Sequence, residues 1–600
     1  MTERIHYRNS VLINKAYQKL VLPDISARLC GMLVTLADSL IAARWIGISA
    51  VSAIALVAPI LLFEQCLHDF FVSGTTQVLI RYKSRGQQAQ ANRAFGVILA
   101  DVFLWYLLIW GLSLIWMKNV LHLFTQNEEL IEDSFLYFIP MAVCYPICEA
   151  GLCLERGFKT DGRNGFFGAR AVITNILNIV FSIVAIQVFH GGILGISIAS
   201  NIASLLGYFW SSSHFFSKQC TIRPDFSALV NWKEARGYLK EERAIGSVYA
   251  LDDGLYAGAA ALLNKAFLLT GGTTALAAVG VAQAVTNIFS SVNGAIQSSE
   301  FSLCGLFYSD HDYRGTVYSL KTAVFVETGF NVTAWILVNL FSQQIGNLYN
   351  VQAAEIMAAL KLCLAFSTLV IIGDGYTNLF SSFMLATERT KMAGAFAVAH
   401  NVMIFLSALL GFAGISFTGL LIVCTLSSAL VALTEALLLI KSGKVLHEVN
   451  QEEITSGSYV LSEDTCAEIS ESVAVALSSV PTLSNSTAEK AALLSEEWSR
   501  LVLFINRKQK NEIRADLRIT ANRKECVITL IDTGKIFDSI YCLKKDDLPD
   551  EYRFSREILL GFSPKATFAR VVNLNISHLI LPLDFLEQQS RTANKEVLHG

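Results

Sequence analysis

Six carboxylates lie inside long apolar stretches of the chain, where an ionised group is costly. They are Asp38, Glu149, Asp252, Asp253, Glu327 and Asp374. A carboxylate in the middle of a membrane costs about 2.5–3.5 kcal/mol on insertion scales, so each one requires a role. One role is a hydrogen bond to a neighbouring helix, and the other is the binding of Na⁺ or a proton. We favour ion binding for Asp38 and Asp374, and both roles stay open for the other acids.

Amide and hydroxyl side chains accompany two of these acidic regions at helical spacing. Asn178 and Ser182 are four residues apart, as are Asp374 and Asn378, so each pair is expected on one helix face.

Two other groups of acids are constrained by their positions. Asp252 and Asp253 are adjacent and would point about 100° apart on a helix, so we expect at most one to face a given cavity. Glu64, His68 and Asp69 lie toward the end of their apolar stretch, and we expect them at the membrane interface.

The elements that position these residues are predicted membrane spans. Hydrophobic residues make up 53% of the 600 residues and charged residues 16%, whereas soluble domains average about 25% charged residues. The net charge is only −3, and no nucleic-acid partner is expected. Runs of roughly 20 apolar residues, enough to cross the hydrocarbon core, predict twelve helices. They lie near 22–44, 50–73, 94–117, 134–154, 168–189, 193–216, 244–268, 275–300, 317–341, 355–383, 393–413 and 417–440.

The twelve predicted spans form two repeats of six. With an offset of about 225 residues, Glu149 aligns with Asp374 and Gly195 with Gly419, and such a long period indicates a duplicated membrane carrier. We therefore predict a first transmembrane repeat over 19–218, a connection over 219–243 and a second repeat over 244–442. In such carriers the substrate path lies between the repeats.

Basic residues predict the orientation of the spans. Lys and Arg are frequent in segment 1–18, in the loops after the second, fourth and tenth spans, and in 219–243, but they are rare in the alternate loops. Because basic loops stay in the cytoplasm, both termini are expected there. The start of the chain is polar and basic and the first span is expected to remain uncleaved, so we predict a multi-pass protein of a prokaryotic plasma membrane (the cell inner membrane).

Several segments, in order, resemble multidrug and toxic compound extrusion (MATE) transporters. DSLIAARWIG at 38–47 resembles the first helix of that family, RYKSRGQQAQAN at 81–92 the loop after the second helix, and RGFKTDGR at 156–163 the loop after the fourth. NIVFS at 178–182 and GISIAS at 195–200 resemble parts of its fifth and sixth helices. The likeness covers residues 18–442.

This resemblance implies an antiporter that exports amphipathic, often cationic, organic molecules in exchange for Na⁺ or H⁺, by rocking its two lobes. It implies a first-half cation site at Asp38, Asn178 and Ser200, with Na⁺ as one candidate ion, although Ser182 stands where many members carry Asp. It implies a second-half site at Asp374 with Asp253 or Asp252. Glu149 and Asn378 complete our candidate transport residues, and the coupling ion replaces any cofactor.

Two other functions stay open. One is a flippase for lipid-linked saccharides, which an Arg-lined central cavity would favour; the spans contain few Arg or Lys residues. The other is a membrane-anchored sensor that acts through its C-terminal region on a cytoplasmic partner.

That region is charge-rich and predicts a linker over 443–455 and a cytoplasmic α+β sandwich domain over 456–600. Helices are expected over 465–480 and 487–507, strands over 512–520 and 525–532, and a hairpin near 568–581. The fold prediction is therefore an all-α membrane protein of twelve helices with this domain appended.

The domain resembles the ATP-binding domain of anti-sigma-factor kinases and histidine kinases. By that resemblance Glu497 would be the catalytic acid, and Asp532 with Gly534 the adenine-binding turn. The Mg²⁺-binding Asn expected four residues after the acid is Leu501, and the glycine-rich lid is absent. Without glycines whose backbone N–H groups approach phosphates, we expect a non-catalytic regulatory domain that could contact a cytoplasmic protein.

Overall fold

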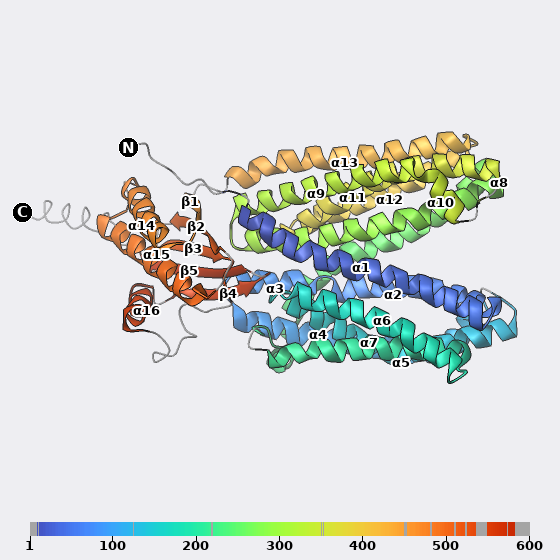
Figure 1. Cartoon of the computed structure of the whole chain (residues 1–600), viewed down its shortest axis with the longest axis horizontal. Coiled ribbons are helices and arrows are strands. Elements are labelled where there is room, and N and C mark those ends of the chain that lie inside the picture. Colours follow the sequence, from blue (N-terminus) through green and yellow to red (C-terminus); the bar gives the residue numbers. More distant parts are fainter. Residues whose placement is uncertain are drawn as a thin grey trace, which may run out of the picture. The chain divides into compact units, whose positions relative to one another are not determined.

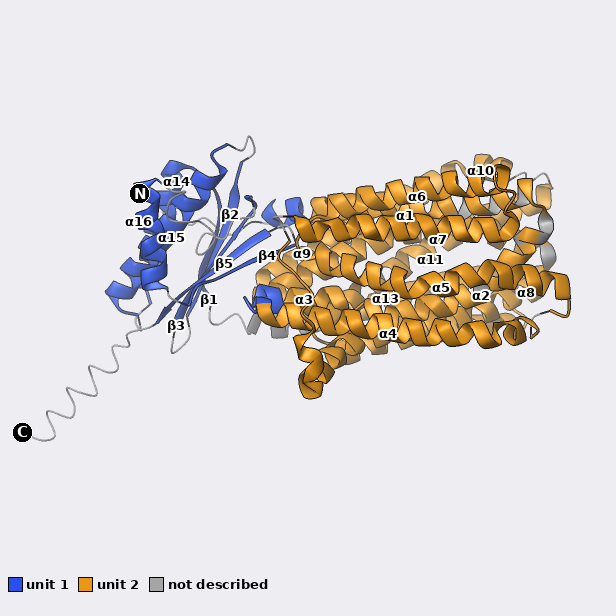
Figure 2. Cartoon of the chain, turned by 90° about the horizontal axis from the view of Figure 1, so that it is seen from below, with its two compact units in different colours: residues 1–16, 82–88, 443–600 blue, residues 17–81, 89–442 orange. Residues whose placement is uncertain are grey.

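The computed structural model describes residues 9–582 except 10, 124, 218–219, 350, 352, 449–452, 481–482, 509–511, 522–524, 536–548, 564 and 573. The chain divides into two compact units (Figure 2). The larger unit comprises residues 17–81 and 89–442, and the smaller one residues 1–16, 82–88 and 443–600.

The larger unit is helical. The first part of the chain forms α1 (Val11–Trp45), α2 (Ile48–Val72), α3 (Thr75–Ser84), α4 (Gln88–Leu121), α5 (Glu128–Lys159), α6 (Asn164–Gln187) and α7 (Gly192–Ser212). Two 3₁₀ turns, Ser213–Phe216 and Phe226–Val230, follow. The second part forms α8 (Trp232–Ser309), α9 (Tyr313–Leu340), α10 (Ser342–Leu348), α11 (Ala354–Ala386), α12 (Thr390–Phe412) and α13 (Phe417–Glu448).

Nine helical segments within the described residues are long and apolar enough to cross a membrane. They lie in α4, α5, α6, α7, the second part of α8, α9, α11, α12 and α13, so the chain is a multi-pass membrane protein. The other three predicted spans fall on α1, α2 and the first part of α8, and membrane crossing by these remains a prediction.

The seventh and eighth predicted spans belong to one long element, α8, which bends at Gly272. This residue has φ 68° and ψ −166°, a conformation outside the helix that glycine adopts without steric cost. The break lies between the two predicted apolar runs.

The helices form two groups that correspond to the halves of the sequence (Figure 1). In the first group α7 packs against α5 and α6, and in the second α8 packs against α9, α11 and α12. The groups meet where α2 packs against α8. Helix α1 contacts both, because Asp24 pairs with Lys159 of α5 while the Tyr17 hydroxyl donates to the carbonyl oxygen of Ile296 in α8.

A buried ion pair ties three helices of the first group together. Arg170 of α6 donates to Glu155 of α5, which also accepts a hydrogen bond from Ser211 of α7. Both charged side chains are less than one-tenth exposed. Because each charge satisfies the other, removing one leaves the other buried and unpaired.

We therefore expect Glu155→Gln to lower the free energy of unfolding by about 3 kcal/mol, the usual cost of breaking a buried pair. The measurement is thermal unfolding of the purified protein in detergent. Glu132→Gln is the control, because its pair with Lys118 is exposed and should contribute less than about 1 kcal/mol. Equal melting temperatures for the two variants would show that the buried pair adds no stability.

The smaller unit contains a five-stranded antiparallel sheet with helices on one face (Figures 1 and 2). The strands are β1 (Glu453–Val460), β2 (Arg514–Ala521), β3 (Glu525–Asp532), β4 (Thr567–Val571) and β5 (Leu574–Pro582), in the spatial order β1-β2-β3-β5-β4. The helices are α14 (Glu463–Ser478), α15 (Asn485–Asn506) and α16 (Asp550–Phe562). Alternate residues of β2, such as Leu517 and Ile519, join Trp498 of α15 in the core.

Two elements of this domain were not predicted. The linker expected over 443–455 is wrong in extent, because α13 continues to Glu448 and β1 begins at Glu453. Ser456, Gly457 and Ser458 interrupt the strand-forming residues of β1, so its strand depends on pairing with β2. Helix α16 was also not predicted. It lies before the last two strands, where the related ATP-binding domains have a glycine-rich lid.

Candidate functional site

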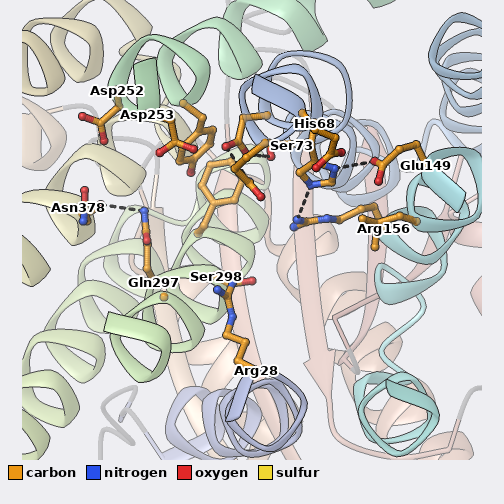
Figure 3. Close-up of a pocket in the computed structure, with 17 residues that line it drawn as sticks. Arg28, His68, Ser73, Glu149, Arg156, Asp252, Asp253, Gln297, Ser298 and Asn378 are labelled. Carbon is orange, nitrogen blue, oxygen red and sulfur yellow. Dashed lines mark hydrogen bonds and ion pairs between the residues drawn. The ribbon is translucent and has the colours of Figure 1, made fainter. Parts of the chain in front are cut away.

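A polar cavity of about 530 Å³ lies inside the helical unit, lined by residues of α1, α2, α5, α8 and α11 (Figure 3). Both halves of the chain therefore contribute to its wall. Most of the lining side chains are charged or polar, and Leu152, Tyr249 and Phe301 supply apolar surface. The volume falls within the range of about 300–1,000 Å³ that is usual for sites binding drug-sized molecules.

Acidic side chains outnumber basic ones in this cavity. The acids are Glu64, Asp69, Glu149, Asp252 and Asp253, and the basic side chains are Arg28, Arg156 and His68. A cleft lined mainly by one sign of charge concentrates molecules of the opposite sign. The cavity is therefore suited to a positively charged molecule.

His68 links an acid and a base of the cavity wall (Figure 3). Its Nδ1 lies 2.8 Å from Oε2 of Glu149, and its Nε2 lies 3.4 Å from a guanidinium nitrogen of Arg156. Because arginine can only donate, Nε2 accepts and Nδ1–H donates to Glu149. The contact with His68 fixes the orientation of the Glu149 carboxylate.

A pair of carboxyl groups connects the two halves across the cavity. Asp69 of α2 accepts hydrogen bonds from Ser73 (2.6 Å) and Gln65 (3.1 Å), and it is also hydrogen-bonded to Asp253 of α8. A hydrogen bond between two carboxyl groups requires that one of them carry a proton. The contact between α2 and α8 is therefore sensitive to the removal of that proton.

Glu64, His68 and Asp69 all line the cavity, and their position at the membrane interface stays a prediction. The last turns of α2 stay inside the helix bundle, packed against α8. The spacing of Glu64 and His68 by four residues was the available signal, because it places both on one helix face.

Asp252 and Asp253 both line the cavity, so the prediction that only one could do so is wrong. The cavity is wide enough to receive two side chains that diverge along α8. Their partners differ, however: Asp253 meets Asp69, whereas Oδ1 of Asp252 accepts a hydrogen bond of 2.7 Å from Asn401 of α12.

Asp374 lies in a second, smaller cavity of about 80 Å³ within the second half. Its Oδ1 accepts a hydrogen bond from Ser428 (2.7 Å) and lies 3.0 Å from Nε2 of His400. Asn378 lines the larger cavity instead, because four residues along α11 correspond to about 6 Å. His400 was missed in the sequence, where an isolated histidine in the apolar run 393–413 was the only signal.

The three residues predicted for the first-half cation site lie together. The hydroxyl of Ser182 lies 3.4 Å from Oδ1 of Asp38 and 3.4 Å from Oδ1 of Asn178. Ser200 is near the same Asp38 carboxylate, and its buried hydroxyl has no hydrogen-bond partner among the described residues. The cluster contains only oxygen ligands, which hard cations prefer, and it has no residue in common with the central cavity.

One further group has the residue types of a metal site. Asp161, His214 and Cys220 lie within reach of a single ion, but Asp161 already accepts hydrogen bonds from His214 and from Thr221. Arg163 donates to the other ring nitrogen of His214. With both ring nitrogens engaged, we assign the group a structural role.

In the C-terminal domain the predicted adenine-binding turn is filled by the protein itself. Oδ1 of Asp532 accepts hydrogen bonds from the Gly534 amide (2.7 Å) and from Asn575 (2.8 Å), and Arg570 donates to Asn575. Burial raises the pKa of Asp532 to about 6, against the opposing effect of these hydrogen bonds. Asp532 is 2% exposed.

The predicted catalytic acid of that domain is also engaged. Glu497 of α15 accepts a hydrogen bond from Ser555 of α16, and Phe504 stacks on Tyr552 with ring centroids 4.1 Å apart. Helix α16 therefore packs directly on the helix that would carry the catalytic acid. Phe537 of the predicted turn lies outside the described residues.

Comparison with known proteins adds to this geometry. The chain matches the family model MatE over residues 23–184 and 261–410. Its fold resembles that of a MOP superfamily transporter from Pyrococcus furiosus, described as having a binding pocket of reverse polarity, with 16% identity and a TM-score of 0.65 over 72% of this chain and 96% of that one. An outward-facing multidrug resistance MATE family transporter gives 16% identity and a TM-score of 0.66 over 74% and 99% of the two chains. None of the curated proteins matches the sequence.

Proposed function

Because this chain belongs to the MatE family of transporters, we propose that it exports amphipathic organic cations in exchange for Na⁺ or protons that move inward. The acid-rich cavity between the two helical halves carries the proposal. Its five acidic residues favour a cation, while Tyr249, Phe301 and Leu152 offer apolar surface to the rest of an amphipathic molecule.

In the proposed cycle the two halves rock about the cavity, so that it opens to one side of the membrane at a time. Two features support such movement. The halves meet mainly where α2 packs against α8, and Asp69 and Asp253 form a proton-dependent contact there. We assign the coupling ion of the first half to Asp38, Asn178 and Ser200.

The flippase alternative is less well supported by the cavity. An anionic lipid-linked headgroup requires a basic wall, and Arg28 and Arg156 are outnumbered by acids. Equilibrium binding to the purified protein separates the two functions. We expect the organic cation ethidium to bind and a lipid-linked pyrophosphate saccharide to bind at least tenfold more weakly; the reverse order would favour the flippase.

For the C-terminal domain we propose a regulatory role without phosphoryl transfer. The internal hydrogen bonds of Asp532 and the packing of α16 on α15 support it. We expect isolated residues 443–600, checked for cooperative unfolding, to show no Mg²⁺-dependent ATP binding up to about 1 mM by calorimetry. A histidine-kinase ATP-binding domain measured in parallel is the control. Saturable Mg²⁺-ATP binding would contradict this role and favour the sensor alternative.

A further inference from the structure

A second group of buried acids lies in the second half, away from both sites described above. Glu327 of α9 is 1% exposed and Glu300 of α8 is fully buried. The two carboxyl groups are close enough to interact electrostatically. Neither lines the central cavity or the cavity of Asp374.

The polar atoms around Glu327 lack partners. Within the described part of the chain, neither oxygen of Glu327 and neither amide atom of Asn293 forms a hydrogen bond, although Asn293 is only 7% exposed. The amide nitrogen of Asn331, one turn from Glu327 on α9, is also unpaired. Buried polar groups are nearly always satisfied, so this concentration requires an explanation.

These side chains converge on one point beside α11. A side-chain carbon at Gly375 would lie 2.3 Å from Oε1 of Glu327 and 2.8 Å from Nδ2 of Asn293. The missing side chain of Gly375 therefore leaves room where a carboxylate and an amide from two different helices meet. The amide can present its oxygen there after a half-turn, since its two orientations differ only in the assignment of O and N.

We propose that Glu327 and Asn293 bind a Na⁺ ion in the second half of the protein. A Na⁺ ion can join the two groups, because it lies about 2.4 Å from each of its oxygen ligands and so bridges oxygens that no direct hydrogen bond connects. Both ligands are oxygens, and the carboxyl group of Glu300, which accepts a 2.8 Å hydrogen bond from Ser382, lies nearby on α8.

The central cavity gives this site a short route to solvent. Gly294, the neighbour of Asn293, and Gln297, one turn further along α8, both line that cavity. The inference extends the proposed function, because each half of the transporter would then carry its own cation site, at Asp38 and at Glu327. The binding of Na⁺ can nevertheless be measured without transport.

The test is equilibrium binding of radioactive Na⁺ to the purified full chain. We expect Glu327→Gln to bind one Na⁺ fewer per chain than wild type, and Asn293→Ala to bind Na⁺ at that site at least tenfold more weakly. Glu355→Gln, an exposed acid at the start of α11, should bind as wild type does. Since Gln is isosteric with Glu and uncharged, Glu327→Gln should also keep its melting temperature in Na⁺-free buffer while losing part of the stabilisation by Na⁺.

Unchanged Na⁺ binding by both Glu327→Gln and Asn293→Ala would overturn the inference, as would a wild-type chain that binds no Na⁺. Failure of the proposed function is a different result. If wild-type vesicles show no ion-driven export but Glu327→Gln still loses one Na⁺, the site stands and the transport proposal falls. If export is intact and the variants bind Na⁺ as wild type does, only the second site falls.

Discussion

Asp38→Asn is expected to reduce ion-driven export of an organic cation at least tenfold while leaving its binding nearly unchanged. Asn cannot alternate between a charged and a neutral state, and it is a weaker ligand for Na⁺. The binding of the coupling ion therefore no longer supplies free energy to the transport cycle. A loss of 1.4 kcal/mol corresponds to a factor of ten. Substrate binding should persist because Asp38 is not among the residues that line the central cavity.

Initial export rates in proteoliposomes and equilibrium binding in detergent measure the two parts of this prediction. Asp374→Asn should also impair coupling, since Asp374 is the partner of His400 and Ser428 in the second half. Glu128→Gln, an exposed acid in the first turn of α5, is the control. Wild-type export by both Asp38→Asn and Asp374→Asn would show that the coupling residues are assigned wrongly.

Asp252→Asn is expected to weaken the binding of a cationic substrate about tenfold. The change removes a negative charge from the cavity wall, and charge interactions over a few ångströms in such partly hydrated sites amount to a few kcal/mol before screening. The side-chain oxygen of the new amide can still accept the hydrogen bond from Asn401, so the contact between α8 and α12 is preserved. The loss should therefore come from the missing charge and not from a rearranged cavity.

Titration of the purified protein with ethidium and with an uncharged aromatic compound of similar size measures this effect. Only the cation should lose affinity in Asp252→Asn, and Glu355→Gln should bind both compounds as wild type does. Equal losses for both compounds would mean that the substitution changes the shape of the cavity. Unchanged binding of the cation would remove Asp252 from the substrate site.

The helices were predictable because lipid imposes a length and a composition that the sequence records directly. The nine apolar segments coincide with predicted spans, and Gly272 marks the bend inside α8 between two apolar runs. In the C-terminal domain the alternating strands β2 and β3 were predicted, whereas β1 was missed because Ser456, Gly457 and Ser458 interrupt its strand-forming residues.

The site was predictable where residues are close in sequence or match a family pattern, and much less where contacts join distant helices. The meeting of Asp38 with Ser182 followed from the resemblance. The contacts of Asp69 with Asp253 and of Asp374 with His400 depend on how the helices pack, which periodicity does not determine. Likewise, Asp532 matched a nucleotide-binding turn, but Asn575, 43 residues away, now satisfies its carboxyl group.

The central claim is that an ion gradient drives an organic cation through this protein, and export by purified wild-type protein in proteoliposomes tests it most directly. Ethidium movement is followed under an imposed Na⁺ gradient and, separately, a proton gradient. We predict that one of these gradients drives ethidium against its concentration difference, and that an ionophore for that ion stops the movement. Ethidium movement no faster than in protein-free liposomes under both gradients would contradict the account.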